Sequence, residues 1–231
     1  MRTFSSRRKF LTSGGALIAA AAVMGGSLSG TGKKDEEDVS PGEDLMREHG
    51  VLKRVLLVYG EAIRRIEAGE ELPPDVIAES ARIIRTFIED YHEGLEEKFL
   101  FPRFEMAGKF VTLVETLLAQ HIAGRKITDL TVSLATAQAL RSPEDRRRLA
   151  TTLRQFIRMY EPHEAWEDTI LFPAFRKLVS RHEYDSLGGD FEKRERELFG
   201  EDGFETMVDK VAAIEKKLGI GDLAKFTPPG L

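Results

Sequence analysis

The 231-residue chain contains no cysteine. No disulfide can therefore hold the fold together, and no thiolate can bind a metal ion. Histidine and the carboxylates remain as the strong metal ligands that this sequence offers. A site built from such nitrogen and oxygen atoms favours iron or manganese over the metals that prefer sulfur.

The chain also lacks a cluster of basic residues that could follow a phosphate backbone. Its formal net charge is −5, and the segment 1–29 holds four basic residues and no acidic one. The remaining residues carry 30 basic and 39 acidic groups, and their charge is −9. We therefore expect no nucleic acid as a partner.

Long hydrophobic runs are absent as well. The weakly apolar stretch 14–24 is too short to span a bilayer comfortably, and it follows the pair Arg7-Arg8 and the dipeptide Phe10-Leu11. Residues 1–29 thus resemble a twin-arginine export signal, and 30–42 reads as a charged linker. The resemblance implies the twin-arginine export machinery as a partner. It also implies a periplasmic or otherwise exported protein, membrane-tethered if the signal is not cleaved.

The most informative feature is an internal repeat. Residues 92–104 and 163–175 share the pattern H-E-x-x-E-acid-x-apolar-L-F-P-x-F, and the stretches around His49 and His121 also match each other. Each copy therefore provides one isolated histidine and, about forty residues later, a histidine four residues before a glutamate. The candidate metal ligands are His49, His92, Glu96, His121, His163 and Glu167.

Apolar residues recur at helical spacing, and no strand pattern is present. The spacing and the turn residues predict helices over about 43–68, 75–106, 108–140 and 142–181. Four long helices joined by short turns predict an all-α, up-down-up-down four-helix bundle over 43–181. Two short helices are expected in the extension 182–231, which would cover a bundle face or mediate self-association.

The positions of the histidines along these helices can be compared. At 1.5 Å per residue, His49 and His92 both lie roughly 30 Å from the turn between their helices, and His121 and His163 lie roughly as far from theirs. The candidate ligands should therefore meet in one layer of the interior. Burying two carboxylates there is costly unless a cation compensates them, although a metal-free network of histidine and glutamate remains the alternative.

This ligand pattern, with Leu-Phe-Pro after each pair, resembles the hemerythrin-like HHE cation-binding family over about 43–180. The resemblance implies a non-haem centre of two oxo- or hydroxo-bridged iron ions. Glu96 and Glu167 would bridge the ions, and the four histidines would be divided between them. The chain departs from the oxygen-carrying hemerythrins at Arg125, where those proteins have a further histidine, and in its last acid, a glutamate four residues after its histidine.

Other residues near the ligands allow several readings. A ferritin-like site would need Glu-x-x-His twice, but Tyr160 stands where the second glutamate belongs, so this alternative fails. Tyr160, one turn before His163 on the same helix face, is instead a candidate to contact and orient this histidine. Tyr91 and Trp166 are expected to pack in the core.

The sequence therefore predicts a di-iron protein that binds oxygen, nitric oxide or peroxide, or that handles iron outside the cytoplasm. An enzyme that reduces peroxide or nitric oxide, and a redox or iron sensor, are the alternatives. Metal and ligand binding is favoured over catalysis, and no catalytic residue is assigned.

Overall fold

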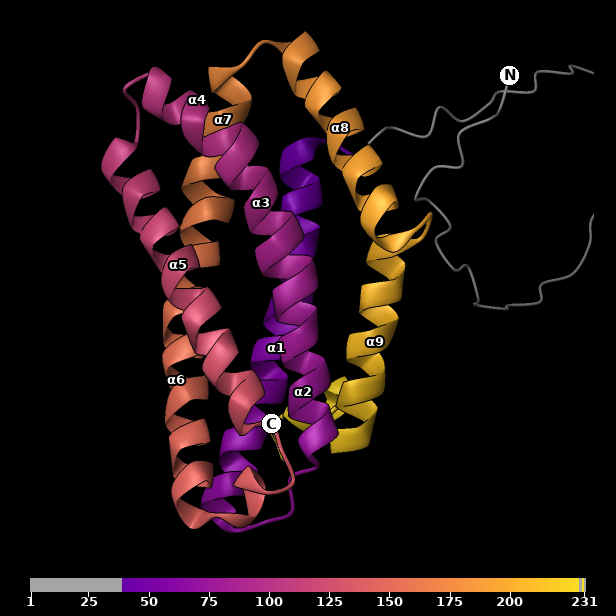
Figure 1. Cartoon of the computed structure of the whole chain (residues 1–231). Coiled ribbons are helices and arrows are strands. Elements are labelled where there is room, and N and C mark those ends of the chain that lie inside the picture. The colour runs from indigo at the N-terminus through magenta and orange to yellow at the C-terminus, as the bar shows by residue number, and fades with distance from the viewer. Residues whose placement is uncertain (1–38, 229, 231) are drawn as a thin grey trace, which may run out of the picture. The chain divides into compact units, whose positions relative to one another are not determined.

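A computed structural model describes residues 39–228 and residue 230. Throughout this part of the chain the secondary structure is helical and no strand is present, which confirms the all-α prediction (Figure 1). The segment that resembles an export signal lies outside the described residues. None of the described helices is long and apolar enough to cross a membrane.

The first helix, α1 (Pro41–Ala68), begins where the sequence supplies a complete cap. The Ser40 side chain accepts a hydrogen bond from the backbone N–H of Glu43, and the Glu43 carboxylate accepts one from the backbone N–H of Ser40. Pro41 occupies the first helical position, where its missing N–H costs nothing. The helix ends at Gly69, whose φ of 69° is accessible to glycine without strain.

The second helical segment covers 74–106 and changes its winding along the way. It consists of α2 (Pro74–Ile83), the π-helix η1 (Ile84–His92), α3 (Glu93–Leu95), the π-helix η2 (Glu96–Leu100) and α4 (Phe101–Met106). The sequence predicted one helix with a bend at Pro102. The structure instead places wider π turns before that proline.

The third and fourth segments form the second copy of the repeat. They consist of α5 (Val111–Leu134), the short 3₁₀ turn η3 (Ala139–Arg141), α6 (Pro143–Trp166), the π-helix η4 (Glu167–Leu171) and α7 (Phe172–Leu178). The expectation that the third helix runs to about residue 140 is wrong, because α5 ends at Leu134. The start of α6 is as predicted, with the Ser142 side chain capping the N–H of Asp145.

Both Leu-Phe-Pro motifs coincide with a π turn, and proline explains why. Pro102 and Pro173 have no N–H to donate to the preceding turn. The residue before each proline bonds five residues back instead of four: Phe101 to the carbonyl of Glu96, and Phe172 to that of Glu167. The helix is therefore wider where these two glutamates begin the turn.

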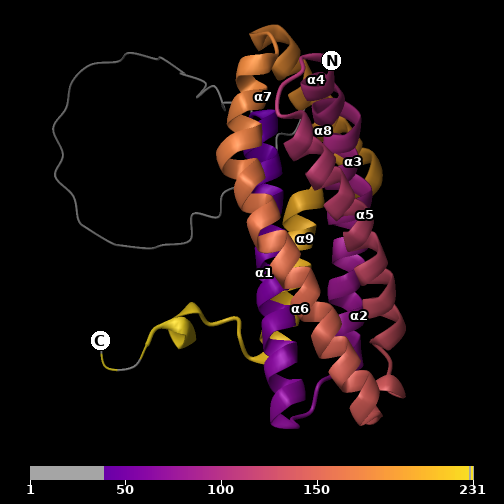
Figure 2. The same cartoon turned by 90° about the vertical axis from the view of Figure 1, so that its left-hand side faces the viewer.

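The C-terminal extension is more helical than predicted, with α8 (Arg181–Phe199), α9 (Gly203–Leu218) and the 3₁₀ turn η5 (Leu223–Phe226). Figures 1 and 2 show α8 and α9 on one side of the bundle and α5 and α6 on the opposite side. Tyr184 of α8 accepts a hydrogen bond from the Gly42 N–H at 3.0 Å, and Arg54 of α1 pairs with Glu215 of α9 at 2.6 Å. The extension thus covers one face of the bundle, as expected.

Candidate metal centre

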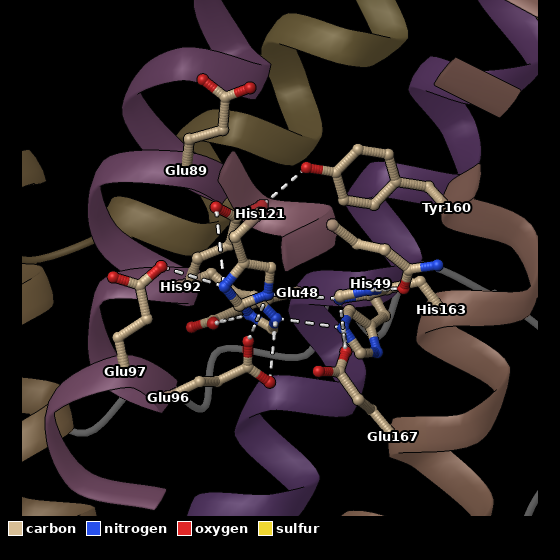
Figure 3. Close-up of polar contacts among 12 residues, drawn as sticks. Glu48, His49, Glu89, His92, Glu96, Glu97, His121, Tyr160, His163 and Glu167 are labelled. Carbon is tan, nitrogen blue, oxygen red and sulfur yellow. Dashed lines mark hydrogen bonds and ion pairs between the residues drawn. The ribbon is translucent and has the colours of Figure 1, made fainter. Parts of the chain in front are cut away.

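All six predicted ligand residues meet in the interior of the bundle (Figure 3). His49 comes from α1, His121 from α5 and His163 from α6, while His92 ends η1. Glu96 and Glu167 are the first residues of η2 and η4. None of the six is more than 3% exposed.

The four imidazoles form two close pairs. The Nε2 atoms of His49 and His92 lie 3.0 Å apart, and those of His121 and His163 lie 3.3 Å apart. Two metal–imidazole bonds of about 2.1 Å at a right angle would place their nitrogens about 3.0 Å apart. The spacing in each pair therefore suits two ligands of a single ion.

The two glutamates connect the pairs. In Glu96, Oε1 lies 3.8 Å from Nε2 of His92 and Oε2 lies 3.5 Å from Nε2 of His121. In Glu167, Oε2 lies 3.4 Å from Nε2 of His49 and 3.1 Å from Nε2 of His163. Each carboxylate thus reaches one histidine of either pair.

These carboxylates lack ordinary hydrogen-bond partners. All four oxygens of Glu96 and Glu167 are buried without a hydrogen bond of acceptable geometry, although imidazole nitrogens lie close by. An uncompensated buried carboxylate costs several kcal/mol. A metal cation bound at each imidazole pair would compensate the charge of these oxygens, so the residues fit a metal centre.

Burial and mutual charge shift the protonation of the cluster. Burial, reinforced by the charge of Glu167, raises the pKa of Glu96 well above its ordinary range. Burial acts in the same direction on Glu167, but His163 and His49 outweigh it and hold that pKa well below its ordinary range. Burial and the charge of His49 lower the pKa of His92, which favours the neutral imidazole that a metal requires.

Each imidazole is oriented by an acceptor on its outer nitrogen. Because a carboxylate or amide oxygen only accepts, Nδ1 carries a proton in each of these contacts, and Nε2 is the nitrogen that faces the interior. The four Nδ1 contacts are His49 to Asp168 at 2.7 Å, His92 to Glu48 at 2.8 Å, His121 to Glu97 at 3.0 Å and His163 to Gln120 at 2.9 Å. Such outer contacts are typical of metal-binding histidines.

Sequence reasoning missed these four partners, although the signal was present. Glu48 and Gln120 each precede a candidate histidine, and Glu97 and Asp168 each follow a candidate glutamate. The repeat therefore aligns them in pairs just as it aligns the ligands. Two further contacts obey the same alignment: Lys53 bonds Glu164 at 2.8 Å, and Arg125 bonds Glu93 at 2.9 Å.

The Leu-Phe-Pro phenylalanines wall the site. The ring of Phe172 stacks on that of His49, and the ring of Phe101 stacks on that of His121, each pair with centroids 5.5 Å apart. Both phenylalanines are buried, so they exclude water from the imidazoles.

Tyr160 lies behind His163, with ring centroids 5.3 Å apart. Its hydroxyl donates to Glu93 at 2.7 Å, and Arg125 joins Glu93 to Glu97 through bonds of 2.9 and 2.6 Å. Tyr160 therefore contacts the candidate ligands through this network rather than by a hydrogen bond of its own to His163.

The expectation for the two other aromatic neighbours is half right. Tyr91 is buried, but Trp166 is 55% exposed, so the prediction of core packing is wrong for Trp166. Trp166 is the last residue of α6, one turn after His163, and Figure 1 shows this helix on the side of the bundle opposite α8 and α9.

Comparison with known proteins supports the same reading. The family model for the hemerythrin HHE cation binding domain matches residues 40–139 and again residues 112–216. The chain is 50% identical over 198 residues to uncharacterized proteins from two strains of Mycobacterium tuberculosis and from Mycobacterium bovis. These matches cover 86% of this chain and 78% of each relative. No solved structure matches significantly.

Proposed function

Because the chain belongs to the hemerythrin HHE cation-binding family, we propose that it is a non-haem di-iron protein that binds oxygen, nitric oxide or peroxide, or that handles iron. One observation carries this proposal: the four histidines form two pairs, and Glu96 and Glu167 each lie close to one histidine of both pairs. Their carboxylate oxygens are buried without hydrogen bonds, and cations would satisfy them.

The arrangement also suggests which residues hold which ion. His49 and His92 would bind one iron, and His121 and His163 the other, because these are the residues whose Nε2 atoms face each other. Glu96 and Glu167 would bridge the two ions. Nitrogen and oxygen donors without sulfur suit iron, which would supply redox chemistry and open coordination positions for a small ligand.

The chain's own residues would orient the ligands and exclude water. Asp168 and its counterparts hold the imidazoles with Nε2 inward. Phe101 covers the His121 ring and Phe172 covers the His49 ring. The network from Tyr160 through Glu93 and Arg125 reaches Glu97 and could hold a proton at the Tyr160 hydroxyl.

This proton-holding network favours the second candidate, an enzyme that reduces peroxide or nitric oxide at the same centre. Steady turnover by the purified protein with an electron donor would favour the enzyme. Binding of nitric oxide without turnover would favour the carrier. A redox or iron sensor would need to change the state of a partner when iron is bound or oxidised.

Export, the topology of the bundle and self-association are proposed as well. The arginine pair in 1–29 supports export by the twin-arginine machinery to the periplasm, and an exported Arg7→Lys, Arg8→Lys variant would contradict it. We also propose that the four helical segments over 41–178 form an up-down-up-down bundle core and that the extension 182–231 mediates self-association. Measurement of the oligomeric state with and without that extension would test the latter.

Iron content is the decisive test. The purified protein should hold about two irons per chain and show a near-ultraviolet band from a bridged ferric pair. His92→Ala and His163→Ala should each reduce the iron content, whereas His182→Ala, the variant of the remaining and exposed histidine, should not. Equal iron content in all four proteins would contradict the proposed centre.

A further inference from the structure

Because the chain is a repeat, each copy has a corresponding path from the surface toward the candidate metal centre, between its two helices. On the α5–α6 side there is a groove of about 270 Å³ that reaches His163. Its walls include Leu113, Leu117, Gln120, Pro162 and Trp166. Pro162 and Trp166 are exposed, so the groove is open to solvent at this end.

The equivalent positions of the first copy are closed. They lie 72 residues earlier on the first helix of the copy and 71 residues earlier on the second. Pro41, Leu45, Glu48, Tyr91, His92 and Leu95 occupy them, and every one of these residues is buried. The two approaches therefore differ although the ligands at their inner ends are the same.

Helix α8 accounts for the difference. It lies along the beginning of α1, where a Cβ on Gly188 would be 3.5 Å from Pro41. Farther along, the Phe199 ring packs on Tyr91 with centroids 5.5 Å apart, and Tyr91 donates a hydrogen bond to Glu195 at 3.4 Å. Through these contacts the extension covers the surface that would otherwise lead to His92.

We propose that a small diatomic ligand reaches the centre along the α5–α6 groove beside His163, and that α8 closes the equivalent approach beside His92. This inference rests on the proposed function. The apolar walls from Leu113, Leu117, Pro162 and Trp166 suit oxygen or nitric oxide better than a charged or bulky ligand. The ion held by His121 and His163 is then the one that the ligand meets first.

Thr116 offers a direct way to obstruct the groove, because its side chain lines the groove and is exposed. Thr116→Phe should slow nitric oxide association with the reduced, iron-loaded protein by about tenfold or more, measured by stopped-flow absorbance. Glu115→Phe places the same ring on the neighbouring exposed residue outside the groove and should leave the rate within about twofold of the wild type. Trp166→Ala should widen the opening and increase the rate.

A second readout does not depend on the iron. Crystals of the full chain pressurised with xenon should show an atom between Leu117 and Trp166, and Thr116→Phe should displace it. If the protein holds iron but Thr116→Phe binds nitric oxide as fast as Glu115→Phe, the proposed route is wrong. If the protein holds no iron, the proposed function fails, while the xenon position still decides whether this groove is accessible.

Discussion

Nδ1 of His49 on α1 donates to Oδ1 of Asp168 at 2.7 Å, across a sequence separation of 119 residues. The contact runs from one copy of the repeat to the other. Its counterpart runs in the opposite direction, from His121 in the second copy to Glu97 in the first. Each copy therefore orients an imidazole of the other, and neither hairpin contains a complete site.

Removing this partner should weaken metal binding without unfolding the protein. Asp168→Ala leaves the His49 ring free to rotate and lowers the basicity of Nε2, so metal affinity should fall by about 10- to 100-fold. Competition with a chelator of known affinity measures the change. Asp185→Ala, which removes an exposed carboxylate on α8, should retain the wild-type affinity, and equal loss in both variants would contradict a specific role for Asp168.

The convergence of the six candidate ligands could be predicted because it depends on local rules. Helical spacing puts His92 and Glu96 on one face, and the distance from each turn sets the level of the histidines. The repeat then supplies the second half. No contact between distant residues had to be known for this step.

The features that the sequence did not reveal depend on packing between elements. Asp168 contacts His49 because α1 of the first copy packs against α6 and α7, the helices on either side of η4 in the second copy. The π turns before Pro102 and Pro173 arise from a choice between bonding four or five residues back, where a simple bend was expected. The exposure of Trp166 depends on which side of the bundle α8 and α9 cover.

Glu89 should make stability depend on pH. Burial, reinforced by the charge of Glu93, raises its pKa to about 7, against the hydrogen bond from Thr128. Below about pH 4.5 the carboxyl is protonated whether the chain is folded or unfolded. As pH rises from there to about 7 the unfolded chain loses this proton first, so the contribution to folding stability is progressively lost.

Glu89→Gln removes that proton exchange and isolates the effect. Relative to the variant, the wild type should lose up to about 3 kcal/mol of unfolding free energy between pH 4.5 and 7. Urea denaturation of both proteins in the same metal state, at several pH values, measures the difference. Glu115→Gln on the exposed side of α5 serves as the control, and parallel profiles for wild type and Glu89→Gln would contradict the prediction.

The close approach of Gly124 to Tyr160 should make this glycine hard to replace. A Cβ at position 124 would lie 2.1 Å from the Tyr160 hydroxyl oxygen, which is held by Glu93. Gly124→Ala should therefore destabilise the protein by about 1–3 kcal/mol, despite the better helix propensity of alanine. The cost should be smaller in a Tyr160→Phe background, and additive effects in thermal unfolding would show that the two sites do not interact.

Gln120 is the one neutral partner among the four side chains that contact the histidine Nδ1 atoms, and its lack of charge should influence the redox potential of the iron. His163 donates to this neutral oxygen at 2.9 Å, whereas its counterpart His92 donates to the carboxylate of Glu48 at 2.8 Å. Gln120→Glu should increase the basicity of the His163 imidazole and stabilise the ferric state more than the ferrous state. A tenfold change in the ratio of the ferric to the ferrous iron affinity lowers a one-electron midpoint potential by about 59 mV.

A redox titration followed in the near ultraviolet measures this shift. Gln138→Glu adds the same charge at an exposed position of the chain and should leave the potential nearly unchanged, so an equal response in both variants would assign the effect to net charge rather than to the contact with His163.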